Sequence, residues 1–334
     1  MGRRARAHAV LAESARAVTA FMARRLASAI PVLFLTTLVS FGIMQIVPGD
    51  PAEIIAGLGA SPQEVARIRT ELGLDQPRLV QLARWYQGMA RGDLGDSLLL
   101  GRSVSRAIVE RLPVTLSLTA YALVLTLVVG VLSGVGAARR PGGWLDQLLM
   151  TVALLGVSFP SFWLGLMLIV VFAVQLDWLP SGGYVPFSES VGGWFRSATL
   201  PAISLALLQI GLLARITRAT MLEALGQDYV RTARTKGLSS AVVVWKHAFR
   251  NVLVPVVTVV GIIVSLLLSG SVVIETVYSV PGIGRLMASA VLRRDYPVIQ
   301  GGLLVTAAGF VLLNLLVDVL YAYLDPRVRY VHDQ

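Results

Sequence analysis

The stretch RITRATMLEALGQDYVRTARTKGLSSAVVVWKHAFRNVLVP, residues 215–255, is a basic, polar segment that separates two apolar runs. Its pattern predicts two short helices that meet at Gly237, because glycine readily takes the left-handed conformation that ends a helix. Ser239 or Ser240 can cap the second helix, and Pro255 can stand at the start of the next apolar span. A chain buried in lipid needs no such segment, so it is interpreted as a docking element for a cytosolic partner. The alternative is a solvated loop decorated with charges.

The 334 residues are 55% hydrophobic and 14% charged, with a mean hydropathy of +0.72. A soluble domain carries about 25% charged residues, so this composition indicates a polytopic membrane protein. A net charge of +10 would suggest nucleic acid in a soluble protein, whereas here it reflects Lys/Arg in inner loops. Cysteine is absent, and His8, His247 and His332 lie outside the apolar runs, which excludes thiolate and intramembrane His sites. We therefore predict no metal, no cofactor and no catalytic residue.

Six apolar runs are candidates to cross about 30 Å of hydrocarbon at 1.5 Å per residue, although the fourth is short and continues as an amphipathic helix. The first is expected to be an uncleaved anchor rather than a signal peptide, since no small-residue cleavage site follows it. The predicted fold class is therefore all-α, a membrane protein with six transmembrane helices. Their expected bounds are 26–47, 113–138, 147–176, 200–214, 255–277 and 298–321.

The distribution of Lys/Arg predicts the orientation of these spans. With the N-terminus inside, the inner segments hold 17 Lys/Arg and the two short outer segments hold 4. Because inner loops accumulate Lys/Arg, both termini and the polar segment are predicted to be cytoplasmic. Residues 1–20 are predicted to be a cytoplasmic extension and 21–334 a single transmembrane domain, with an outer loop at 48–112 and a cytoplasmic loop at 215–254.

Two amphipathic patterns lie in the outer loop, SPQEVARIRTEL (61–72) and QPRLVQLARWYQGMARG (76–92). Apolar residues repeat at helical spacing in both, and Pro62 suits a first helical turn after Ser61. The composition favours a pair of surface helices on the membrane face. A landing site for an extracytoplasmic partner is the functional alternative.

Pro160 lies in the middle of the third run, within LLGVSFPSFWLG. A central proline kinks a helix and frees a carbonyl group, which Ser158 or Ser161 can satisfy. Ser158, Phe159, Pro160 and Ser161 are therefore candidates to line or gate a path. A kink that only serves helix packing is an equally good interpretation.

Other residues near the spans are interpreted structurally. Gly130 and Gly134, extended by Gly136, form a small-residue face for close helix packing. Glu275 and Asp318 lie near span ends, so they are expected to be interfacial caps rather than a proton relay. The aromatic residues expected to anchor the chain at the membrane interface are Trp178, Tyr184, Trp194 and Phe195.

The polar segment resembles the cytoplasmic loop of ATP-binding-cassette importer permeases, whose motif has EAA, three residues, Gly and a later I-x-L-P. Arg231-Thr232-Ala233 stands at EAA, Gly237 at the Gly and residues 252–255 at I-x-L-P, so that Arg231 replaces the family's Glu. Further blocks are similar to the B-type permease of the dipeptide, oligopeptide and nickel branch, over residues 22–330. These blocks are LGLDQP, RGDLGDS, ERLPVTLSLT, SFPSFWLG, DWLPSGGY, ETVYSVPGIGRL and DVLYAYLDPRVR.

The resemblance implies a type I ABC-importer-like fold in a bacterial inner membrane, as half of a heterodimeric channel with a paralogous permease. It also implies two cytosolic ATP-binding subunits and an extracytoplasmic solute-binding protein. The chain lacks the phosphate-binding GxxxxGK[ST] pattern, so it is expected not to be an enzyme. The ATPase-coupling surface is expected to include Tyr229, Arg231, Ala233, Arg234, Lys236, Gly237, Leu238, His247, Asn251 and Pro255.

The resemblance implies a peptide cargo, dipeptide or oligopeptide, with nickel, glutathione or another small solute as the alternative. Selectivity is expected to reside largely in the binding protein, because the path itself offers Ser, Thr, Gln209 and aromatic side chains. An ion-gradient-driven secondary transporter is a different class of function. It would need intramembrane acids or inverted repeats, for which the spans give little support.

Overall fold

The computed structural model describes most of the chain, and the regular structure there is helical. Within the described ranges, β structure is limited to an isolated bridge between Asp96 and Ser103. The predicted helical class is therefore confirmed for these residues, while the expected extension at residues 1–20 lies outside them. The described residues are 27–42, 45, 50–57, 59–71, 73–97 and 99–324.

Several described helices are long and apolar enough to cross a membrane, which confirms the polytopic class. A bent pair, Trp144–Gly156 and Ser161–Gln175, meets at 105° and adds a further candidate span. The first expected span, 26–47, is described as an apolar helix over Ala27–Gly42, so the total of six stays a prediction. The four unbroken candidates are Val104–Arg139, Val191–Leu225, Ser240–Val277 and Tyr296–Val317.

The chain divides into two compact units. The large unit holds Thr115–Val280 and residues 312–324, and the small unit holds the described residues from 27 to 114 together with 281–311. Two helices, α5 (Val104–Arg139) and α13 (Tyr296–Leu324), contribute residues to both units.

Helix α8 lies at the centre of the large unit, where it packs against α6, α7 and α11. Its position explains its sequence, because one helix buried on several sides must be apolar over most of its circumference. In chain order the elements of this unit outside α5 and α13 are α6 (Trp144–Ser158), α7 (Ser161–Leu168), the π-helical η1 (Ile169–Gln175), α8 (Val191–Leu225), α9 (Asp228–Thr235), α10 (Ser240–Val242), the π-helical η2 (Val243–Ala248) and α11 (Phe249–Val277).

Glycines allow neighbouring helices to approach α8 closely. A Cβ on Gly134 would lie 2.6 Å from the carbonyl oxygen of Ala214 and 2.6 Å from Cβ of Thr217. A Cβ on Gly211 would lie 2.5 Å from the carbonyl oxygen of Ala153. Within the predicted small-residue face of α5, close packing is confirmed at Gly134, since only glycine fits such contacts, but not at Gly136, where a Cβ would meet only Leu149 Cδ1 at 4.0 Å.

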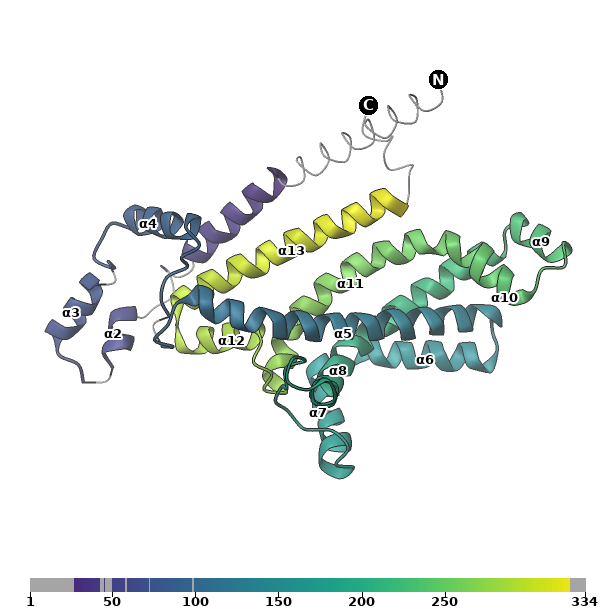
Figure 1. Ribbon diagram of the computed structural model, residues 1–334, viewed down its shortest axis with the longest axis horizontal. Coiled ribbons are helices and arrows are strands. Elements are labelled where there is room, and N and C mark those ends of the chain that lie inside the picture. The colour runs from purple at the N-terminus through teal and green to yellow at the C-terminus, as the bar shows by residue number, and fades with distance from the viewer. Residues whose placement is uncertain are drawn as a thin grey trace, which may run out of the picture. The chain divides into compact units, whose positions relative to one another are not determined.

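The single kinked helix expected over 147–176 is instead two helices. Phe159 leaves the helical conformation (φ −106°, ψ 140°) and Pro160 begins the next helix from an extended conformation (φ −60°, ψ 141°). The cause is local, because the proline ring clashes with a preceding residue in the α conformation. Figure 1 shows the resulting change of direction between α6 and α7.

Glu275 is fully buried in the large unit, at 0% exposure. The hydroxyl of Thr115 on α5 donates a 2.6 Å hydrogen bond to its Oε1. A neighbouring helix therefore covers Glu275 and supplies a donor, as a buried carboxyl requires, while its expected place at the membrane interface stays a prediction. The side chain of Asp318, for which the same role was expected, lies outside what the structure describes.

Trp194 also lies inside the large unit, at 8% exposure, although an interfacial anchor was expected there. Its Nε1 donates to the hydroxyl of Tyr184 over 3.2 Å, and that hydroxyl is hydrogen-bonded to Ser117 at 2.8 Å. Trp178 and Phe195 are exposed, and their anchoring role stays a prediction.

The small unit contains the expected helices of the outer loop. The pattern at 61–72 forms α3, where the hydroxyl of Ser61 accepts the N–H of Glu64 at 3.2 Å, as its capping position predicts. The elements of this unit outside α5 and α13 are the helix Ala27–Gly42, α2 (Pro51–Ala56), α3 (Pro62–Glu71), α4 (Arg78–Ala90) and α12 (Ile283–Arg293).

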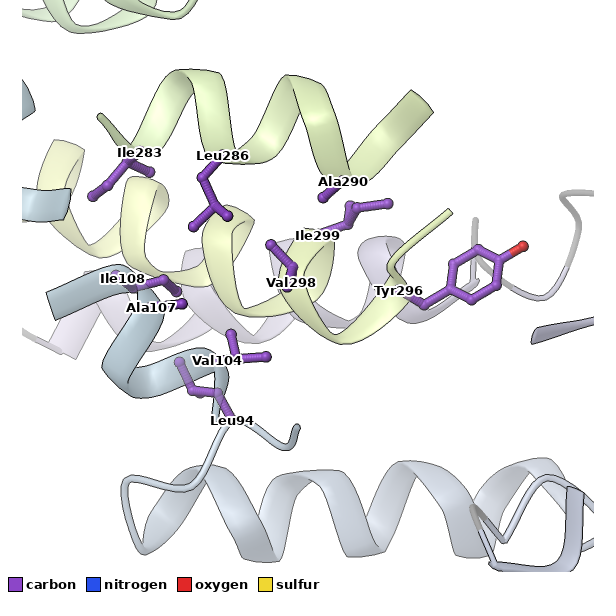
Figure 2. Close-up of a cluster of buried hydrophobic side chains, with 10 residues drawn as sticks. All are labelled: Leu94, Val104, Ala107, Ile108, Ile283, Leu286, Ala290, Tyr296, Val298 and Ile299. Atoms are coloured by element: carbon purple, nitrogen blue, oxygen red, sulfur yellow. The ribbon is translucent and has the colours of Figure 1, made fainter. Parts of the chain in front are cut away.

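A cluster of buried apolar side chains joins α12 to the first turns of α5 and α13 (Figure 2). Beside this cluster, the hydroxyl of Ser97 donates to Oδ2 of Asp295 at 2.5 Å and ties the preceding loop to the α12–α13 connection. The members of the cluster are Leu94, Val104, Ala107, Ile108, Ile283, Leu286, Ala290, Tyr296, Val298 and Ile299.

Candidate functional site

Residues 228–255, hereafter the loop hairpin, form a helix, a tight turn and a return helix. At the end of α9, Gly237 takes the left-handed conformation (φ +79°). Its N–H donates to the carbonyl of Arg234 at 2.9 Å, and the N–H of Leu238 donates to the carbonyl of Ala233 at 3.4 Å. This pair of bonds is the Schellman arrangement, so the predicted glycine corner is confirmed.

After the corner the chain returns in one continuous helical run and not in a separate short helix. Ser239 occupies the N-cap position, without a side-chain hydrogen bond to the helix, and α10, η2 and α11 then follow without a break. Pro255 lies inside α11, which begins at Phe249, so its expected place at the start of the fifth span was wrong. The sequence between Ser240 and Phe249 contains no glycine or proline that would end the helix.

The inner face of the loop hairpin is closed by small and branched side chains. On α9, Val230 and Ala233 are three residues apart and therefore lie on one face. Both are buried, Ala233 to 5% exposure, and α9 packs against η2, where Val243 and Val244 are buried. Ala233, which was expected on the coupling surface, therefore packs inside the loop hairpin.

A hydrogen bond holds the hairpin's two arms together near its base. Nδ2 of Asn251, on α11, donates to the hydroxyl of Tyr229, on α9, at 2.7 Å. Both side chains were predicted to belong to the coupling surface. The structure gives them an internal contact as well.

Large apolar side chains remain exposed on the hairpin's outer surface. Trp245 is 44% exposed and packs edge-to-face on Phe249, with ring centroids 5.2 Å apart. Trp245 and Val242 were not among the predicted coupling residues. The signal for them was the run AVVVW, whose members cannot all face inward on a helix. The exposed large hydrophobic residues of the loop hairpin are Tyr229, Leu238, Val242 and Trp245.

The basic side chains fall into two groups. Arg218, before the hairpin, donates from Nε and Nη2 to the carboxylate of Asp146 on α6, at 2.5 and 2.7 Å, so it belongs to helix packing. Within the hairpin, Arg231 is 77% exposed and lies 3.8 Å from Asp228. The other exposed basic side chains of the hairpin are Arg234, Lys236, Lys246 and Arg250.

The structure places the remaining predicted residues as follows. His247 and Pro255 are half-buried. At the α6–α7 break, the hydroxyl of Ser158 donates to the carbonyl of Leu154, one turn back in α6, at 2.9 Å. Ser158, Phe159 and Pro160 are exposed and Ser161 is half-buried; their role in a path stays a prediction.

The described residues thus form a polytopic helical core that carries an exposed, glycine-turned hairpin, which is the architecture of a membrane-embedded protein. Residues 107–330 match the family described as the binding-protein-dependent transport system inner membrane component, and residues 18–119 match the N-terminal membrane component of such systems. The chain belongs to this family, which confirms both the predicted resemblance and the predicted inner-membrane location.

Relatives and a solved structure agree with the family. A Brucella abortus (strain 2308) protein named "Putative peptide transport system permease protein" is 54% identical over 94% of this chain and 100% of its own length. The dipeptide transport system permease protein DppB of Alkalihalophilus pseudofirmus is 42% identical over 93% of this chain and 99% of its own. The MetNI methionine ABC transporter, in inward-facing conformations, has the same fold, with a TM-score of 0.53 and 18% identity over 65% of this chain and 95% of the matched chain.

Proposed function

We propose that this chain is the B-type permease subunit of an ATP-driven importer of short peptides. It forms half of the translocation path, and a paralogous permease forms the other half. The family and the near full-length relatives of peptide and dipeptide systems support this function. The chain itself performs no ATP hydrolysis, which belongs to separate subunits.

The observation that carries the proposal is the loop hairpin. Its inner face is closed by Val230 and Ala233, yet its outer face leaves apolar and basic side chains exposed. Such a surface suits a helix that enters a groove on another protein. Two cytosolic ATP-binding subunits dock on this hairpin and on its counterpart in the second permease.

The arrangement in the membrane follows from the charge distribution. Six spans with both termini in the cytoplasm put the hairpin inside and the loop 48–112 outside, where helices α3 and α4 give the solute-binding protein a surface to approach. Residues 21–334 act as one permease domain in this proposal. Rigid-body rocking of the spans, driven by closure of the ATPases, exposes the path to each side in turn.

Reconstitution of the complete transporter tests the function. The two permeases and the ATPases are placed in liposomes, binding protein is added outside, and uptake of labelled dipeptide, glutathione and nickel is followed with and without ATP. We expect ATP-dependent uptake of dipeptide that requires the binding protein. Uptake by this chain alone under a proton gradient without ATP would instead establish a secondary transporter.

A further inference from the structure

The charge of the loop hairpin is almost entirely of one sign. Between residues 228 and 255 the sequence has five Lys/Arg and a single acid, Asp228. Arg231 occupies the position at which the importer motif has glutamate, so this surface is positive where the motif is negative.

Arg231 is available to a partner. It is 77% exposed, its neighbour Asp228 is 97% exposed, and 3.8 Å separates the nearest charged atoms. An exposed pair of this kind contributes about 0.2–1 kcal/mol and holds neither side chain in place. Arg234 lies one helical turn from Arg231 and on the same face of α9, so both guanidinium groups can meet one surface.

Exposed apolar side chains add an apolar component to the surface of the hairpin. Tyr229 lies on α9, Leu238 directly follows the glycine corner, and Trp245 stands on the arm against which α9 packs. Aromatic and arginine side chains together are the residue types that dominate binding energy at protein interfaces. A partner that covers them must remove the arginines from water, and a buried guanidinium needs a carboxylate or a comparable acceptor.

We propose that the groove which receives the loop hairpin on the ATP-binding subunit is acidic, with an apolar floor and carboxylates placed to clamp Arg231 and Arg234. Arginine is suited to this role because its planar guanidinium binds a carboxylate through two parallel hydrogen bonds, which lysine cannot reproduce. This inference rests on the proposed function and adds the chemistry that pairs this permease with its own ATPases.

A basic surface with a tryptophan also has the chemistry of a segment that binds anionic lipid headgroups. The geometry favours the protein partner. Figure 1 shows α9 past the ends of α5 and α6 in the large unit, so the hairpin projects beyond neighbouring spans. The Asn251–Tyr229 hydrogen bond also joins its two arms, so the helical corner is held in shape by the chain's own contacts.

Charge reversal in the complete complex tests the acidic groove. The double substitution Arg231→Glu with Arg234→Glu is compared with Arg139→Glu with Arg140→Glu, which makes the same charge change at exposed residues outside the hairpin. Retention of the ATP-binding subunits on the purified permease pair is measured from low to high salt. We expect the hairpin variant to weaken retention at least about tenfold and the control to match wild type.

Further variants separate the clamp from a general charge effect. Arg231→Lys keeps the charge but loses the two-bond geometry, so its retention should fall between wild type and the double variant. Recovery of the paralogous permease in each preparation shows that the variants fold and assemble.

The outcomes are distinct. Equal retention by wild type and the hairpin double variant overturns the acidic groove while leaving the importer function intact. Unchanged ATPase retention with lost binding to phosphatidylglycerol vesicles assigns the cations to lipid and also overturns it. A wild-type permease pair that never retains ATP-binding subunits would instead contradict the proposed function.

Discussion

Gly237 is the residue on which the loop hairpin depends. Its φ of +79° lies in the left-handed region, and open space surrounds the position that a Cβ would occupy. A substitution there therefore changes backbone conformation without causing a clash. Substitutions at this position therefore test whether the left-handed corner is needed for the hairpin's structure and for ATPase retention.

We expect Gly237→Val to destabilise the corner by about 1–2 kcal/mol, because a β-branched residue disfavours the left-handed conformation. Gly237→Asn is the matched control, since asparagine tolerates that conformation. Hydrogen exchange across residues 228–248 and ATPase retention measure the effect. Protection and retention should fall for valine and stay near wild type for asparagine. A valine variant with wild-type protection would show that the corner does not need a left-handed residue.

Glu275 is a second residue at which the effect of a substitution on stability depends on a neighbouring side chain. Glu275→Ala removes the buried carboxyl that accepts the Thr115 hydrogen bond, which should cost about 1–3 kcal/mol. Glu275→Gln keeps an oxygen that accepts the same bond and should cost less. Thermal unfolding in detergent micelles compares the two variants. If the alanine and glutamine variants unfold at the same temperature, the hydrogen bond does not contribute measurably to stability.

At the scale of elements, the contact between α5 and α8 depends on glycine. The carbonyl of Ala214 and the side chain of Thr217 fill the space beside Gly134, whereas a Cβ on Gly136 would meet only Leu149 Cδ1 at 4.0 Å. Both glycines lie on α5, so alanine raises helix propensity equally at the two positions. Any difference between the two variants therefore reports packing.

Gly134→Ala should reduce the free energy of unfolding by about 1–3 kcal/mol relative to Gly136→Ala, because backbone and side-chain atoms of α8 must move apart. Unfolding of the permease pair in detergent, followed by loss of helical circular dichroism, measures the difference. Equal stability of the two variants would mean that α8 moves away from α5 without a cost in the free energy of unfolding.

At the scale of the whole molecule, the absence of cysteine makes sidedness directly measurable. We expect Leu238→Cys, in the loop hairpin, to react with a membrane-impermeant maleimide only from the cytoplasmic side. Leu79→Cys, at an 80% exposed position on α4, should react only from outside. Labelling of intact spheroplasts reports exposure to the outside, and labelling of inverted vesicles reports exposure to the cytoplasmic side. Labelling of Leu238→Cys in intact spheroplasts would reverse the proposed orientation.

The sequence by itself determined the features that rest on local chemistry. The helix at α3, its start at Pro62 after Ser61 and the glycine corner at Gly237 were predicted because helix starts and turns depend on a few adjacent residues. The polytopic class followed from apolar run length, and family membership from motifs spread along the chain.

The tertiary structure alone decided which side chains face protein. Trp194 and Glu275 lie near span ends and suggested interfacial roles, yet neighbouring elements bury both. Ala233 faces inward and Trp245 outward because α9 packs on η2, a contact that sequence periodicity does not specify. Burial is a property of the elements that meet, and these elements are brought together by residues far apart in the chain.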